Sequence, residues 1–258
     1  MTRRLLSVAI LMVTSGALAQ TTTTAPAIDA KAREALVLLQ ERDKTLKDFI
    51  ADVLYESVHA QTDSVTSSDG VLAYNNDGTR ITFSLRRTNI KEDGKLRKAD
   101  TKQDIIYDGE WLHLVDHDQK DLQSFQVSPP PKPGEPPRNP LRFDGPLPMP
   151  LGQNADEVVA AFEVKLIAPG KEDPVSKNEV RHLRLKPRNK DKQSFELLDL
   201  WVDMKDALPV KMEVEKKDGG IMRITMKNVS INEGKGTTLG KPQTDKDWAI
   251  RIKPLEQK

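Results

Sequence analysis

Two histidines form the best candidate for metal chemistry in the sequence. His113 and His117 lie four residues apart, a spacing that would place both imidazoles on one face of a helix, where they could bind zinc. The segment follows Asp108-Gly109 and alternates like a strand, in which the two side chains would be about 13 Å apart. Ligands of one zinc ion lie only a few ångströms from each other. We therefore expect no metal site, and interpret the segment as a surface strand that runs into a turn.

The other common signatures of catalysis are missing from the sequence. There is no Gly-x-Ser-x-Gly elbow, no phosphate-binding loop and no Gly-x-Gly-x-x-Gly after a predicted strand. The chain has no cysteine, which excludes disulfides, thiolate metal sites, Fe–S clusters, cysteine nucleophiles and the acylated cysteine of a bacterial lipoprotein. Its acidic residues are scattered, and no spacing pairs two of them for acid–base work. We expect neither an enzyme nor a bound cofactor.

The balance of charge limits the classes of partner. Forty Lys and Arg residues against 39 Asp and Glu residues give a formal net charge of +1. A chain so close to neutral lacks the excess of positive charge that nucleic-acid binding requires, so we expect no nucleic-acid partner. With 258 residues, of which 37% are hydrophobic and 31% charged, the chain is long enough to form one large domain.

The first twenty residues resemble an export signal. Met1–Arg4 is positively charged, Leu5–Val13 is almost wholly apolar, and Ala17–Ala19 has the small-x-small pattern that signal peptidase recognises. We predict a signal peptide over residues 1–19, cleaved after Ala19, and a flexible mature N-terminus over residues 20–27. The apolar run is shorter than the roughly 20 residues of a membrane span, and no later segment is long and apolar enough. We therefore expect a periplasmic protein without a transmembrane span.

The elements that follow are one helix and many strands. Apolar residues at steps of three and four predict an amphipathic helix over Asp29–Lys47. Alternation of apolar and polar residues then begins, and turn sequences such as Asn76-Asp77-Gly78, Asp108-Gly109 and Asp218-Gly219-Gly220 separate the alternating runs. Because Asn, Asp and Gly tolerate the positive φ angles of tight turns, these sequences predict hairpins. The pattern indicates an antiparallel meander that forms a barrel or half-barrel.

The parity of the strands predicts which residues share the apolar face of the sheet. These are Leu72, Tyr74, Ile81, Phe83, Leu85, Leu112, Leu114, Val210, Met212, Val214, Met222, Ile224 and Met226. They pack against the first helix as ordinary core, or some of them line a cavity for a ligand. The methionines favour a cavity slightly, because their unbranched side chains adapt to ligands of variable shape.

Two segments interrupt or extend this pattern. Residues 128–150 contain ten of the 17 prolines, so they form a connector, a peptide-like ligand for a proline-recognising domain, or a flap over the sheet. Asn154–Glu157 then resembles a capping box that opens a short helix ending at Phe162. Residues 236–258 form a C-terminal extension, in which Trp248–Ile252 is a last strand or an appendage.

The order of these elements resembles the periplasmic outer-membrane lipoprotein carriers of the LolA family and their wider LolA-like superfamily. The similarity covers residues 28–235 and rests on the segments Phe49–His59, Gly70–Tyr74, Ile105–Leu112, Leu183–Pro187, Phe195–Asp203, Leu208–Met212 and Asp218–Asn232. The resemblance implies a mainly β (α+β) fold. Its sheet is an unclosed antiparallel half-barrel with an N-terminal helix and a lid of helix and loop.

The resemblance also implies a function. Such a protein binds the acyl chains of lipoproteins or lipids in an apolar cavity and moves them toward the outer membrane. It is a monomer that works with an inner-membrane exporter and an outer-membrane acceptor. The alternative is a LolA-like sensor or structural module that recognises a lipid or peptide and contacts an envelope partner. The carrier is our first hypothesis. Two departures from the carriers support the alternative: Asn76-Asp77 stands where the carriers have Arg-Pro, and the proline-rich residues 128–150 replace part of the lid sequence.

Overall fold

The computed structural model describes residues 28–97, 101–130, 134, 139, 141–142, 151–171, 173–174 and 176–255. The predicted signal peptide and residues 20–27 lie outside these ranges, as does most of the proline-rich segment. Within the described ranges, no helix has the length and apolarity that crossing a membrane requires.

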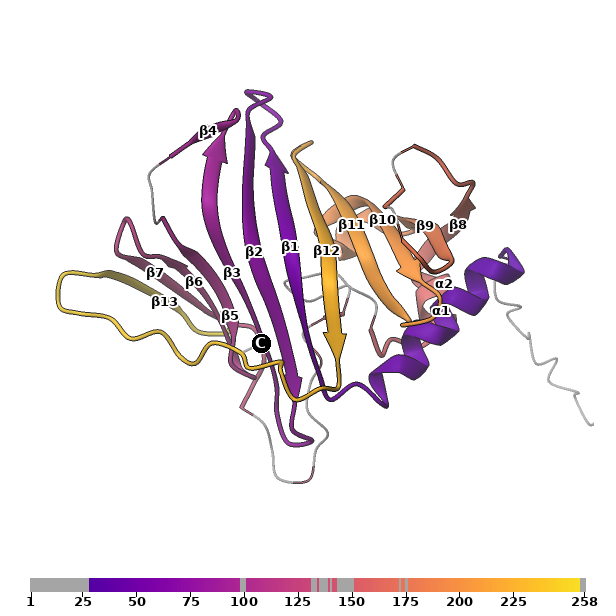
Figure 1. The fold of residues 1–258 in the computed structure, drawn as a ribbon, viewed down its shortest axis with the longest axis horizontal. Coiled ribbons are helices and arrows are strands. Elements are labelled where there is room, and N and C mark those ends of the chain that lie inside the picture. Colours follow the sequence, from indigo (N-terminus) through magenta and orange to yellow (C-terminus); the bar gives the residue numbers. More distant parts are fainter. Residues whose placement is uncertain are drawn as a thin grey trace, which may run out of the picture.

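Thirteen strands of the described chain form one curved sheet (Figure 1). They are β1 (Asp48–Val58), β2 (Val65–Asn76), β3 (Ile81–Glu92), β4 (Lys95–Leu96), β5 (Gln103–Tyr107), β6 (Trp111–Asp116), β7 (Asp121–Gln126), β8 (Phe162–Ile167), β9 (Val180–Pro187), β10 (Phe195–Asp203), β11 (Leu208–Lys216), β12 (Ile221–Ile231) and β13 (Ala249–Lys253). Their order is β13-β7-β6-β5-β3-β2-β1-β12-β11-β10-β9-β8, with β4 beside β3. Because the two end strands do not pair with each other, the sheet is open. The predicted mainly β, unclosed half-barrel is confirmed.

The predicted turns form the expected hairpins. Gly78, Gly109 and Gly219 all have positive φ angles, of 86°, 103° and 82°, and they connect β2 to β3, β5 to β6 and β11 to β12. At Gly109, an added Cβ would lie 2.6 Å from the Cγ of Arg80. This turn therefore requires glycine both for its backbone conformation and for space.

The first helix, α1 (Ala30–Asp43), begins as predicted but ends four residues before Lys47. The Asp29 side chain caps it by accepting hydrogen bonds from the N–H groups of Lys31 (2.8 Å) and Ala32 (3.3 Å). Beyond its end, Asn232 Oδ1 accepts hydrogen bonds from the backbone of Lys47 and Asp48. This contact joins residues about 185 positions apart, so the local pattern of apolar residues could not reveal it.

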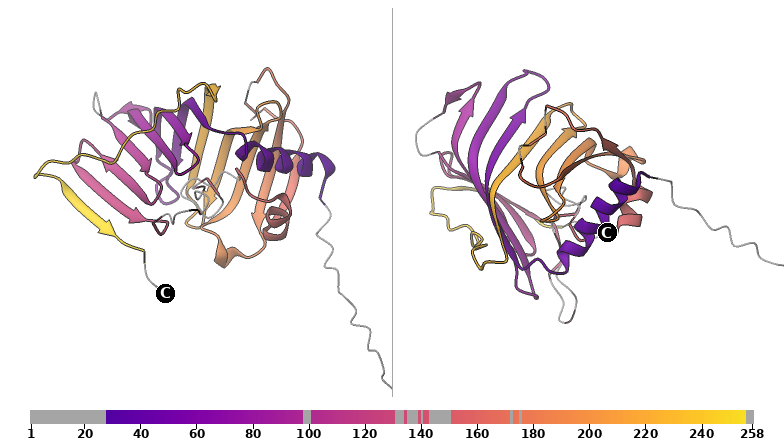
Figure 2. Two further views of the ribbon diagram at one scale, coloured as in Figure 1. Left: turned by 90° about the horizontal axis from the view of Figure 1, so that it is seen from below. Right: turned by 45° about the vertical axis from the view of Figure 1, so that its right-hand side comes forward.

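Both longer helices lie on the concave side of the sheet, near β8 and β9 (Figure 2). The second of them, α2 (Ala155–Ala161), begins where predicted, and Asn154 is its N-cap, because Asn154 Oδ1 accepts hydrogen bonds from Asp156 N and Glu157 N. Phe162 does not end the helix but begins strand β8, which the sequence analysis did not predict. A short 3₁₀ helix, η1 (Lys190–Lys192), connects β9 to β10.

A smaller apolar cluster covers the convex side of the sheet. It contains Ile106, Val115 and Leu122, against which Leu239 and Trp248 pack. The C-terminal chain therefore crosses the outside of the sheet before it forms β13, which pairs with β7 in parallel. Trp248–Ile252 thus leads into a last strand, and this pair departs from the predicted antiparallel arrangement.

Asp48 fixes the start of this C-terminal chain. Its buried carboxylate accepts hydrogen bonds from the N–H groups of Gly234 (3.2 Å), Lys235 (3.1 Å) and Gly236 (3.1 Å). We expect Asp48→Ala to lower the free energy of unfolding by about 1–3 kcal/mol, because it leaves buried N–H groups without an acceptor. Urea unfolding would measure this loss. The exposed Asp52→Ala on the same strand is the control, and an equal loss in both variants would contradict the assigned role.

Candidate functional site

Most of the predicted ligand-binding residues lie in the main core. Nine of the thirteen are buried in one cluster that also contains residues of α1 and α2: Leu72, Tyr74, Ile81, Phe83, Leu85, Met212, Val214, Ile224 and Met226. Leu112 and Met222 are half-buried and pack against this cluster, and Leu114 and Val210 are half-buried. The shared apolar face therefore exists, and much of it packs as core. A role of these residues in ligand binding stays a prediction.

Val210 departs from the simple alternation on which its assignment rested. In the pairing of β10 with β11, Trp201 is opposite Lys211, but Val202 is opposite Pro209. The register shift leaves Val210 as the extra residue of a bulge. Pro209, and not Val210, therefore takes the position facing Val202.

Residues next to and within the proline-rich segment help to cover the concave face. Leu141 and Leu151 are fully buried members of the main cluster. The Asn139 side chain donates hydrogen bonds to Asp43 Oδ1 (2.7 Å) and to the Leu151 carbonyl oxygen (3.2 Å). The described residues of this region therefore pack against α1 and the core.

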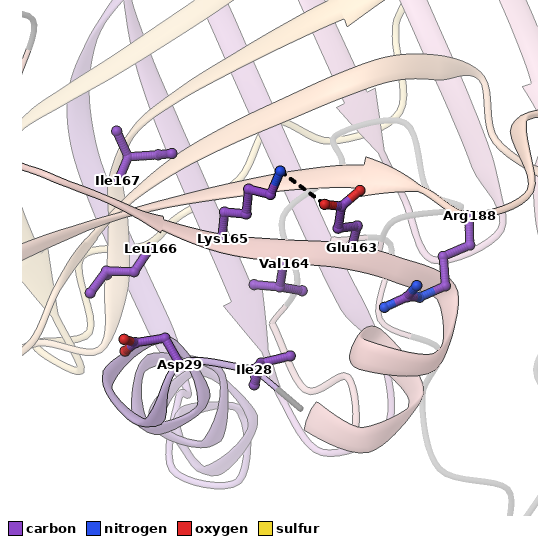
Figure 3. A pocket seen from close by; sticks show the side chains of 8 residues that line it. All are labelled: Ile28, Asp29, Glu163, Val164, Lys165, Leu166, Ile167 and Arg188. Carbon is purple, nitrogen blue, oxygen red and sulfur yellow. Dashed lines mark ion pairs between the residues drawn. The ribbon is translucent and has the colours of Figure 1, made fainter. Parts of the chain in front are cut away.

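An open pocket lies at the edge of the sheet, between the start of α1 and strand β8 (Figure 3). Its volume is about 450 Å³, and it is lined by Ile28, Asp29, Glu163, Val164, Lys165, Leu166, Ile167 and Arg188. Val164 and Leu166 point toward the helix, where Ile28 faces them (Figure 3). Glu163 and Lys165 point the opposite way and form an ion pair of 2.9 Å.

The alternation of strand β8 produces this arrangement. Phe162 and Val164 are buried, whereas Glu163 and Lys165 are exposed. The strand is the last of the sheet and pairs with β9, so Leu166 lies beside Leu183, which is fully buried in the core. The apolar wall of the pocket is therefore continuous with the main core.

Charged groups stand at the two ends of the pocket. Asp29 caps helix α1, while the Arg188 Nε donates a hydrogen bond to the carbonyl oxygen of Val159 (3.2 Å). The pocket thus combines an apolar wall with two acidic and two basic residues, because Glu163 and Lys165 also line it. Such a combination suits an apolar chain with a polar end. The sequence analysis assigned Asp29 to the predicted helix and missed all the pocket residues of β8.

The predicted surface position of His113 is wrong. His113 is buried, and its Nδ1 lies 2.8 Å from Ser124 Oγ while its Nε2 lies 3.3 Å from Asp108 Oδ2. Burial is tolerated because both ring nitrogens have a hydrogen-bond partner. His117 follows strand β6 and pairs separately with Asp104 at 2.8 Å. Among the described residues, no group of three or more His, Cys, Asp or Glu could hold a metal ion.

The Ser124–His113–Asp108 row has the order of a hydrolase triad but not its exposure. Ser124 and His113 are both buried, so a substrate carbonyl has no access to the hydroxyl oxygen. Asp108 also accepts hydrogen bonds from the backbone N–H groups of Trp111 (2.8 Å) and Glu110 (3.1 Å) in the turn. We assign this row a structural role, which is to join β6, β7 and the preceding turn.

Acid should weaken this row within a narrow range of pH. Burial raises the pKa of Asp108, but hydrogen bonds with His113, Trp111 and Glu110 outweigh burial and hold the pKa at about 2 instead of its usual 3.8. Between about pH 2 and pH 4 the Asp108 carboxylate is ionised in the folded protein but protonated in the unfolded chain. The contribution of Asp108 to stability is therefore complete above about pH 4. The contribution is lost as the pH falls through about 2.

We therefore expect Asp108→Asn to lose less stability than the wild type between pH 4 and pH 2, although it is less stable at pH 7. Urea unfolding at pH 7, 4, 3 and 2 would measure both effects. Parallel losses in the two proteins across this range would contradict the assigned role of Asp108.

No protein-family model and no curated protein matches this sequence. Several solved structures are similar to it. An uncharacterised conserved protein of Thermus thermophilus has 10% identity and a TM-score of 0.45, covering 86% of this chain and 99% of its own. A LolA superfamily protein of Nitrosomonas europaea has 12% identity and a TM-score of 0.29, covering 77% and 94%. LolA superfamily proteins are thus among the structures that this chain resembles.

The Pseudomonas aeruginosa MucA/MucB complex provides a further likeness. The identity is 14% and the TM-score 0.44, over 82% of this chain. The match spans only 59% of the Pseudomonas chain. Since all three TM-scores are below 0.5, the likenesses give no information about a ligand, and the proposals below rest on the residues of this chain.

Proposed function

We propose that this protein is a periplasmic carrier that binds acyl chains of lipoproteins or lipids between the concave face of the sheet and its helical cover. The supporting observation is the pocket of about 450 Å³ between α1 and β8, a volume within the usual range of ligand sites. Its wall contains Ile28, Val164 and Leu166, and it continues into the core through Leu183.

The apolar half of the pocket lining suits an acyl chain, and the charged half suits a polar end group. Burying one methylene group contributes about 0.8 kcal/mol, so a few methylene groups against this wall give useful affinity without a covalent bond. Asp29 and Arg188 provide charged groups in the lining that suit the polar end of such a ligand. A carrier also benefits from an open pocket, because its ligand must leave again.

The remaining parts of the proposal come from the sequence. The export signal predicted over residues 1–19 is the basis for a periplasmic location. The resemblance to lipoprotein carriers is the basis for a route toward the outer membrane, with an inner-membrane exporter as donor and an outer-membrane protein as acceptor.

One observation favours the alternative, a module that contacts an envelope partner. Strand β13 lies at one end of the sheet and exposes Ile250 (49%) and Ile252 (63%). An exposed edge strand with apolar side chains can pair with a strand of another protein. This edge would serve a sensor that recognises a ligand at one end of the sheet and a partner at the other.

Binding of a fluorescent fatty acid tests the carrier, and native mass spectrometry separates it from the alternative. We expect the folded protein to bind this probe saturably, and a triacyl lipopeptide to displace it. Native mass spectrometry of protein purified from its host should show acylated molecules bound. Wild-type protein that binds no probe, although folded by circular dichroism, would overturn the carrier and favour the interaction module.

A further inference from the structure

A second polar group stands on the concave face, far from the pocket along the sheet. Arg87 of β3 has the same parity as Leu85, which belongs to the main core, so its side chain starts on the concave side. Arg87 is half-buried. Its direct neighbours across the ladder are Gly70 of β2 and Gln103 of β5.

The backbone beside Arg87 leaves no room for a side chain at Gly70. An added Cβ at this glycine would lie 2.5 Å from the Arg86 carbonyl oxygen and 3.0 Å from Val53. The Arg87 side chain reaches residues of β2 and β1. Its Nε donates to Ser68 Oγ (2.9 Å), and its Cζ lies 4.0 Å from the centre of the Tyr55 ring on β1.

The partners of this cation are neutral. Besides Ser68 and the Tyr55 ring, the guanidinium donates a hydrogen bond to Gln103 Oε1 (3.0 Å). Within the described part of the chain, no carboxylate lies at ion-pair distance from it. The acidic neighbour Asp116 is occupied instead by Gln103 Nε2 (2.7 Å). A half-buried cation without a contacting counter-ion is costly in a folded protein, and this one is held in place by three neighbours.

The electrostatics around Arg87 leave positive charge available. Burial is the largest influence on its pKa and lowers it, and the nearby Arg97 guanidinium lowers it further, whereas Tyr55 and Asp116 act in the opposite direction. An incoming anion would relieve the cost of burying the cation. By contrast, the adjacent Arg86 on the convex side is already paired with Asp104 at 2.9 Å.

Apolar surface adjoins this cation on the same face. Ile105 and Leu114 are opposite each other on β5 and β6, and Leu112 and Phe125 are opposite each other on β6 and β7. All four are half-buried. Both helices lie at the other end of the sheet (Figure 2), so they do not cover this surface. A cation beside half-exposed apolar side chains is complementary to an amphiphile with an anionic head group.

We propose that Arg87 forms an anion site that binds the phosphate or carboxylate head group of an amphipathic ligand, whose apolar chain lies along Ile105 and Leu114. The inference goes beyond the proposed function, because this site lies apart from the pocket between α1 and β8 and would hold a second amphiphile on the same sheet. Phosphate and carboxylate share the chemistry that a guanidinium recognises, and they would come from phospholipids and from fatty acids respectively.

Calorimetric titration with three ligands tests the site. The ligands are dodecyl phosphate, dodecanoate and uncharged dodecanol, each kept below its aggregation concentration. Each ligand is titrated into the wild type, into Arg87→Gln and into the control Lys91→Gln, which removes an exposed charge from the same strand. We expect the wild type and the control to bind both anions at least tenfold more tightly than dodecanol. Arg87→Gln should bind all three ligands equally, with its affinity for dodecanol unchanged. The anion bound more tightly identifies the source of the head group.

The outcomes distinguish this inference from the proposed function. Equal affinity of the wild type for all three ligands would overturn the anion site and leave the carrier standing, whereas no binding of any ligand would overturn the carrier and the site with it. If Arg87→Gln does not fold, the salt dependence of ligand binding by the wild type tests the anion site instead. Added salt should weaken the binding of dodecanoate but not that of dodecanol, and equal salt dependence would overturn the site.

Discussion

Met212→Asp is expected to unfold the protein. Met212 is only 1% exposed and lies in the main core between Leu200 on β10 and Ile224 on β12. A carboxylate there would be buried without a partner, which costs several kcal/mol, an appreciable part of the whole stability of a domain. Circular dichroism would show either a protein that is already unfolded at 25 °C, with no cooperative thermal transition, or a greatly lowered Tm.

Two further variants make this result specific. Met212→Leu keeps the volume and apolarity of the side chain, so it should cost less than about 1.5 kcal/mol. Leu54→Asp places the same charge on the exposed side of β1, where Leu54 is 37% exposed, and should change stability little. If Met212→Asp kept a Tm near that of the wild type, Met212 would line a hydrated cavity and would not be core.

Leu166→Asp is expected to weaken binding of the fatty-acid probe in the pocket while the protein stays folded. Leu166 is half-buried at the edge of the sheet and points into the pocket (Figure 3). The carboxylate of the introduced aspartate can reach water, so the substitution lowers the stability of the fold only slightly. An acyl chain beside it would displace that water, and we expect the affinity for the probe to fall at least tenfold.

A residue of the adjacent strand provides the matched control for the pocket. Lys186→Ala changes an exposed side chain on β9 that does not line the pocket. Probe affinity should be unchanged in this variant. Equal affinities of Leu166→Asp and the wild type would exclude the pocket as the site of binding.

The sequence predicted the strands and their faces well, because both follow from local patterns. Alternation with a period of two indicated β3, β11 and β12, and Asp-Gly turns located the hairpins between the strands. The same patterns could not show that nine of the predicted residues are core. The residues that cover them, such as Leu39 of α1 and Leu141, are distant along the chain.

The pocket was missed although its signal was present in the sequence. Phe162, Val164 and Leu166 alternate with Glu163 and Lys165, which is the pattern of a strand with one buried face. The capping-box pattern before it predicted a helix ending at Phe162, and the sequence analysis assigned no element to residues 163–167. That Ile28 faces this strand depends on the docking of α1 across the sheet, which no local pattern contains.

Photo-crosslinking with a diazirine-bearing fatty acid tests the proposed binding site most directly. After irradiation and proteolysis, mass spectrometry identifies the labelled residues. We expect label on Ile28 and on strand β8, with Val164 and Leu166 most heavily modified, and we expect unlabelled fatty acid to suppress it. Label that resists competition, or that gathers at the exposed Ile250 and Ile252 of β13 while β8 stays unmodified, would contradict binding in the pocket.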